Sequence, residues 1–122
     1  MFSDCRVLAE LNVTGFDTSE VTNMSHMFHS CQVLKEIDVT GFNTGKVTDM
    51  SKMFEWSLSL KSLDLRNFDF DQVTDFNEIF DALGRDAVNK PINILVTQEQ
   101  YDILKDKETG INPEYSTLVI VP

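Results

Sequence analysis

Two patterns of apolar residues alternate along the chain, and each pattern returns after 26 residues. The first has the spacing Leu-x-x-Leu-x-Leu-x-x-Phe, and its three copies are Leu8, Leu11, Val13 and Phe16; Leu34, Ile37, Val39 and Phe42; and Leu60, Leu63, Leu65 and Phe68. Apolar and polar residues alternate in the middle of each copy, which is typical of a β-strand with one buried face. We therefore expect one strand in each period, with Ile37 at a central core position and a sharp turn after each strand.

The second pattern predicts a short helix in each period. Val47, Met50, Met53 and Phe54 have the spacing i, i+3, i+6 and i+7, which places them on one face of a helix. Asp49 or the threonine before it has a side-chain oxygen that can cap such a helix. A helix of this length is marginal alone, so we expect it to pack against the predicted strands.

Strand, turn, helix and return together predict one coil of a leucine-rich-repeat solenoid. The expected fold is an α/β repeat with a parallel sheet on one face, short helices on the other, and a C-terminal α/β cap. Three 26-residue units occupy residues 1–26, 27–52 and 53–78, and a fourth unit begins before residue 83.

The C-terminal part, residues 84–122, departs from the period. We interpret it as a degenerate last repeat followed by a structural cap. Residues 92–96 form an apolar run that predicts a strand, and the capping-box pattern from Thr97 to Gln100 predicts a helix that continues to about Lys107. Residues 118–121 predict a final strand.

The repeated unit Met-Phe-x-x-Cys-x-x-Leu-x-x-Leu-Asp-Val-Thr-x-Phe-Asp-Thr-x-x-Val-Thr-Asp-Met-Ser resembles the 26-residue repeat of the BspA-like leucine-rich repeat family of bacterial surface proteins. The third unit departs from this motif at residues 57–58 and 66–67 and at Phe70. The resemblance implies surface display and adhesion to host or neighbouring-cell components. It implies a location at the cell surface or outside the cell, although the chain carries no signal peptide.

The chain begins in the middle of a repeated unit, because Met1-Phe2 aligns with Met27-Phe28. We expect either a fragment of a longer protein or a designed sequence, whose first coil has no cap. The apolar edges of that coil would then be covered by further repeats upstream or by end-to-end self-association, and they are Phe2, Leu8, Leu11 and Phe16.

Charge and motif content exclude several functions. Ten basic and twenty acidic residues give a net charge of -10, which disfavours nucleic acid and anionic membranes as partners. No apolar run is long enough to span a bilayer, so we expect no membrane insertion within this segment. No hydrolase, metalloprotease, phosphate-loop or dinucleotide motif is present. We expect a domain that is not an enzyme and that needs no cofactor and no metal.

The candidate binding residues are the polar side chains that alternate with the core positions of the predicted strands. If the strands stack in register, these side chains form ladders on an exposed sheet, the usual recognition surface of a solenoid. They are Glu10, Asn12, Glu36, Asp38, Asp64 and Arg66. The functional interpretation is an acidic patch for a protein partner; the structural alternative is a solvated strand face whose acids simply belong to the repeat.

Four other groups have structural alternatives as well. Equivalent positions Cys5 and Cys31 suit a stack of buried thiols better than a disulfide, and they lack the partners of a metal site. The oxygen-rich row at residues 17–20, 43–46 and 69–72 suits turns better than calcium. His26 and His29 have no histidine at equivalent positions, and we interpret them as solvated residues. Phe70 and Trp56 could each be an exposed aromatic anchor, but we favour packing against the cap for both.

Three hypotheses for function follow. The first is a protein-protein interaction module of the adhesion type in a bacterial cell-surface or secreted protein, with a host or neighbouring-cell surface component as its partner. The second is a structural spacer or stalk. The third is an accessory repeat domain of a larger secreted enzyme. Reversing the charges of Glu36, Asp38 and Asp64 would separate a binding module from a spacer.

Overall fold

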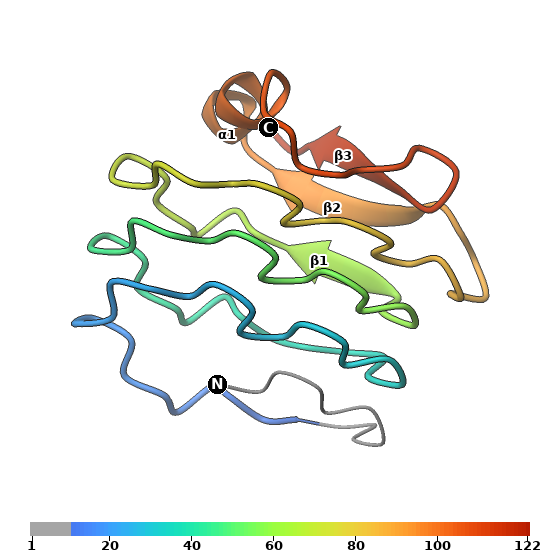
Figure 1. Cartoon of the computed structure of the whole chain (residues 1–122), viewed down its shortest axis with the longest axis horizontal. Helices are drawn as coiled ribbons and strands as arrows, with labels where there is room; N and C mark the ends of the chain where they lie inside the picture. Colours follow the sequence, from blue (N-terminus) through green and yellow to red (C-terminus); the bar gives the residue numbers. More distant parts are fainter. Residues whose placement is uncertain (1–10) are drawn as a thin grey trace.

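The computed structural model describes residues 11–122. Its regular elements are three parallel strands in one sheet and one short helix: β1 (Ser62–Asp64), β2 (Ile92–Val96), α1 (Gln98–Leu104) and β3 (Ser116–Ile120), with the strands in the order β1-β2-β3. Leu63 lies opposite Ile94, which in turn lies opposite Leu118. N-terminal to the sheet, successive segments without regular structure run side by side (Figure 1).

The predicted leucine-rich-repeat solenoid is therefore wrong. Among residues 11–122 the strands are confined to one three-stranded sheet, whose first strand has 3 residues, and the helix α1 has 7. The expected strands at residues 34–42 and 60–68 are absent or reduced to β1, and the expected helices at the methionine-rich positions are turns. Two physical reasons, one for each element, account for these differences.

The helices fail because alternate backbone amides donate to a different segment. Met24, His26, Phe28 and Ser30 donate to carbonyls 25 residues further along, at N···O distances of 2.8–3.1 Å. Between them, Met27 and His29 donate instead to the carbonyl three positions back, and Ser25 donates to Oδ1 of Asn23. An α-helix needs every amide to donate to the carbonyl four positions back, so this pattern excludes it. We call residues 22–31, 48–57 and 74–83 the turn ladder; in its third segment Glu78 and Phe80 donate to the carbonyls of Glu108 and Thr109.

Positive backbone φ angles accompany the pattern. Two residues in each segment of the turn ladder have φ between 56° and 64°, and they are His26 and Ser30, Lys52 and Trp56, and Glu78 and Ala82. A left-handed residue at every fourth position interrupts a right-handed helix. None of the six is a glycine, so each carries a conformational cost that the surrounding hydrogen bonds must offset.

The strands are short because aspartate and asparagine side chains accept hydrogen bonds from the backbone two residues further on. Asp38 accepts from the amide of Thr40 at 3.0 Å, and Asp64 accepts from the amide of Arg66 at 3.1 Å. An amide that donates to a side chain two residues away cannot also donate to a neighbouring strand. The extended segment accordingly turns at each of these residues.

The core is made by the residues that the two apolar patterns select. Met50, Met53 and Phe54 are fully buried, and the rings of Phe28 and Phe54 stack with their centres 5.6 Å apart. Ile37 is an exception: it is only partly buried, so its predicted place in the centre of the core is wrong. It lies at the base of a surface hollow, which is described below.

The C-terminal elements follow the sequence closely. The strand at 92–96 is confirmed as β2, and the capping box between Thr97 and Gln100 is present in full. Helix α1 ends at Leu104, three residues earlier than expected, because the carbonyls of Glu108 and Thr109 accept hydrogen bonds from the last segment of the turn ladder. Within residues 11–122 no helix combines the length and the apolar character needed to cross a bilayer.

The positive φ of Ala82 predicts an unusual response to mutation. Ala82→Gly should raise the free energy of unfolding by about 0.5–1 kcal/mol, because glycine adopts φ 57° without steric cost. The same change at Ala87, which is buried and not among the positive-φ residues, should lower it by about 1 kcal/mol. Urea unfolding of the two variants measures both, and equal losses would contradict this account of the turn ladder.

Candidate binding surface

Three of the predicted binding residues meet at an open hollow of about 960 Å³ on the surface. Asn12, Glu36 and Asp38 line it. The other lining residues are Leu11, Val13, Thr14, Lys35, Ile37 and Lys61. Asp64 and Arg66 do not line the hollow, and Glu10 lies outside the described residues.

The hollow has an apolar base and charges of both signs around it. Leu11 and Ile37 are partly buried against the core and contribute the base. Lys35 and Lys61 add positive charge beside the acids, and Nζ of Lys61 is 3.7 Å from Oε1 of Glu36. A purely acidic patch, as expected from the sequence, is therefore not what the described residues form. The two lysines occupy equivalent positions 26 residues apart, a signal that the sequence does contain.

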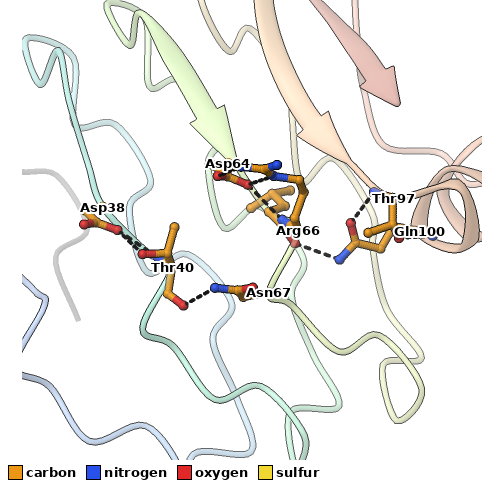
Figure 2. Close-up of polar contacts among 8 residues, drawn as sticks. Asp38, Thr40, Asp64, Arg66, Asn67, Thr97 and Gln100 are labelled. Carbon is orange, nitrogen blue, oxygen red and sulfur yellow. Dashed lines mark hydrogen bonds and ion pairs between the residues drawn. The ribbon is translucent and has the colours of Figure 1, made fainter. Parts of the chain in front are cut away.

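Asp38 is held in place by its own chain. It accepts hydrogen bonds from the hydroxyl of Thr40 at 2.6 Å and from the amide of the same residue at 3.0 Å, as Figure 2 shows. The hydroxyl bond first, and the amide bond second, hold the pKa of Asp38 below its usual value. The carboxylate is thus fixed and ionised, and its first role is that of a turn residue.

The carboxylate of Asp64 is also engaged by its own chain, in this case by the side chain of Arg66. The guanidinium group donates to both carboxylate oxygens, from Nε at 3.0 Å and from Nη2 at 2.8 Å (Figure 2). Hydrogen bonding to Arg66 lowers the pKa of Asp64, and the same contact raises the pKa of Arg66. A partner that used either group would have to compete with this bidentate pair.

The oxygen-rich row forms turns, as the structural interpretation predicted. Asp17, Asn43 and Asp69 each accept a hydrogen bond from the amide two residues further on. Buried Thr18 and Thr44 connect consecutive segments, because their hydroxyls donate to the carbonyls of Asn43 and Asp69 at 3.0 Å.

His29 is not the solvated residue that the sequence suggested. Its side chain is 24% exposed, and its Nε2 is 2.9 Å from Oε1 of Glu55. Glu55, Glu78 and Asp81 place one carboxylate oxygen each within 4.8 Å of the others. Because His29 contacts Glu55 and Lys52 contacts Glu78, protein groups already pair these acids, and we assign no metal to them. The sequence does contain a signal for this cluster, because residues 29, 55 and 81 occupy equivalent positions of the 26-residue period.

The remaining candidates divide between core and surface. Phe70 is buried and packs edge-on against Phe76 at 5.4 Å, so it is not an exposed anchor. Trp56 is 39% exposed, with the guanidinium of Arg85 5.3 Å from its ring centre. Cys31 is fully buried, whereas Cys5 lies outside the described residues, so the thiol stack stays a prediction.

Comparison with known proteins gives one match. A family model described as "Mycoplasma protein of unknown function, DUF285" matches residues 1–106. No curated protein and no solved structure matches the chain.

Proposed function

The chain belongs to the DUF285 family of Mycoplasma proteins of unknown function, and we propose that it is a non-enzymatic protein-protein interaction module of the adhesion type. The observation that carries this proposal is the open hollow around Ile37, which combines apolar residues with charged groups of both signs. We take this hollow, rather than the whole predicted ladder of acids, as the binding surface.

The composition of the hollow suits a protein segment. Protein interfaces have an apolar centre and a polar rim, and charges of both signs determine which partner fits. Leu11 and Ile37 would contact an apolar side chain of the partner. Lys35 and Lys61 would attract acidic groups on it, while Glu36 would attract a basic one.

The same lining supports a function other than catalysis. Among the described residues that line the hollow, Thr14 carries the only hydroxyl, and it donates to Oδ1 of Asn12 at 2.7 Å. These described residues include no histidine and no cysteine. They therefore contain no Ser-His, Thr-His or Cys-His pair of the kind used in nucleophilic catalysis.

We propose a location at the cell surface or outside the cell. The resemblance of the 26-residue motif to a repeat of bacterial surface proteins supports it, and the partner would then be a component of a host or neighbouring cell. The net charge of -10 favours a protein partner over nucleic acid.

A charge swap in the hollow tests the proposal. Glu36→Lys with Lys61→Glu keeps the net charge and the local ion pair, but it inverts the electrostatic pattern around Ile37. We expect the double variant to lose most of a partner that the parent retains from extracts of extracellular matrix and bacterial surfaces. Asp38 and Asp64 are left intact because they hold turns, so folding should be unaffected.

The matched control is the swap Glu20→Lys with Lys46→Glu. These residues form an exposed ion pair with an N···O distance of 2.9 Å, and neither lines the hollow. The control variant should retain the partner. Equal retention by both variants would place binding elsewhere, and no captured partner for the parent would favour the spacer hypothesis.

A further inference from the structure

A buried glutamate connects the three segments of the turn ladder. Glu55, in the middle segment, is 7% exposed. Nε2 of His29, from the first segment, lies 2.9 Å from its Oε1. On the other side, a carboxylate oxygen of Glu55 lies within 4.8 Å of carboxylate oxygens of Glu78 and Asp81, both from the third segment. The buried carboxyl group thus lies between a histidine of the first segment and two acids of the third.

Carboxylates this close repel one another when all are ionised, and a proton on one of them removes part of the repulsion and supplies a hydrogen-bond donor. Glu55 is the buried member of the three, so ionisation costs most there. The other charged group that faces Glu55 is Lys52, from its own segment.

We propose that a proton bound at Glu55, between His29 and the two acids of the third segment, makes the contact between the three segments of the turn ladder sensitive to pH. With the proton in place, Glu55 can donate a hydrogen bond to a carboxylate of the third segment. Loss of the proton leaves three carboxylates within 4.8 Å of one another. This pH sensitivity depends on the side chains of the cluster alone and not on the proposed binding function.

The expected direction follows from the pKa of Glu55. Burial first, and the hydrogen bond to Glu78 second, raise this pKa above the ordinary 4.5, against smaller opposing effects of His29 and Lys52. A group whose pKa is raised by folding stabilises the folded state fully below its unfolded value. This stabilisation is lost as the pH rises through the folded pKa.

The test compares the parent with Glu55→Gln by urea unfolding at a series of pH values from about 4 to about 8. Glutamine can still donate a hydrogen bond to Glu78, but it cannot ionise. We expect the parent's urea midpoint to fall, relative to that of the variant, as the pH rises above 4.5. A constant difference between the two midpoints would overturn the proposal. Glu36→Gln, at a side chain that is 80% exposed, is the control and should keep a constant difference from the parent.

A second measurement covers the case in which Glu55→Gln fails to fold. The carboxyl carbon of Glu55 can be followed by NMR during a pH titration of the parent protein. Titration of this carbon above the ordinary value of a glutamate supports the proposal. Titration of Glu55 at or below the ordinary value would overturn it.

Discussion

Phe54→Ala is expected to remove about 3–5 kcal/mol from the free energy of unfolding, the largest effect of any single change proposed for this protein. Phe54 is fully buried, and its ring stacks on that of Phe28 at 5.6 Å. Its removal would leave a cavity between segments that few other groups can fill. Since small domains are stable by about 5–15 kcal/mol, much of the total would be lost.

Urea unfolding followed by circular dichroism measures this loss. Val88→Ala is the control, because Val88 is 95% exposed and its truncation should change stability by less than about 0.5 kcal/mol. Phe54→Leu should fall between the two, since it retains part of the buried volume. An unfolding midpoint for Phe54→Ala that equals the parent's would mean that the ring is not in the core.

Gln100→Ala is expected to have the second largest effect, a loss of about 2–4 kcal/mol. The side chain is buried, and its Nε2 donates to the carbonyls of Leu65 at 2.7 Å and Phe68 at 2.8 Å. Its Oε1 accepts from the amide of Thr97 at 2.9 Å (Figure 2). Alanine would remove this partner from the carbonyl of Phe68 and the amide of Thr97, and the carbonyl of Leu65 would keep only the amide of Phe68, at 2.9 Å. These groups lie at the junction between α1 and the chain after β1.

The matched control is Gln98→Ala on the same helix. Gln98 is exposed, and its side chain makes one hydrogen bond, to Asp102 at 3.1 Å. This variant should lie within about 0.5 kcal/mol of the parent. If Gln100→Ala were equally mild, the two backbone carbonyls would have other partners, and the junction would not depend on Gln100.

The sequence predicted which residues are buried better than it predicted how the backbone is arranged. Met50, Met53 and Phe54 are in the core, as their spacing required. The same spacing, however, fits both a helix and the turn ladder. The choice between them depends on whether an amide bonds within its own segment or 25 residues away, and a local pattern does not contain that information.

One local signal did favour turns over strands. Asn or Asp is followed two residues later by Thr or Ser at Asn12, Asp38 and Asp49, and each of these side chains accepts the amide of the later residue. Interpreted as turn residues, they predict short strands and side-chain oxygens that already accept hydrogen bonds from the backbone. The apolar base of the hollow could not be predicted, because the partial exposure of Ile37 depends on how neighbouring segments are spaced.

The hydrogen bonds of the turn ladder also determine how the protein should respond to mechanical force. Four amides, from Met24 to Ser30, connect the first segment to the second, and four from Met50 to Trp56 connect the second to the third. A force that peels one segment from its neighbour breaks these bonds one after another, whereas a force along the segments loads all four together. The force needed to separate the segments should therefore be low when one segment is peeled away and high when the segments are pulled along their length.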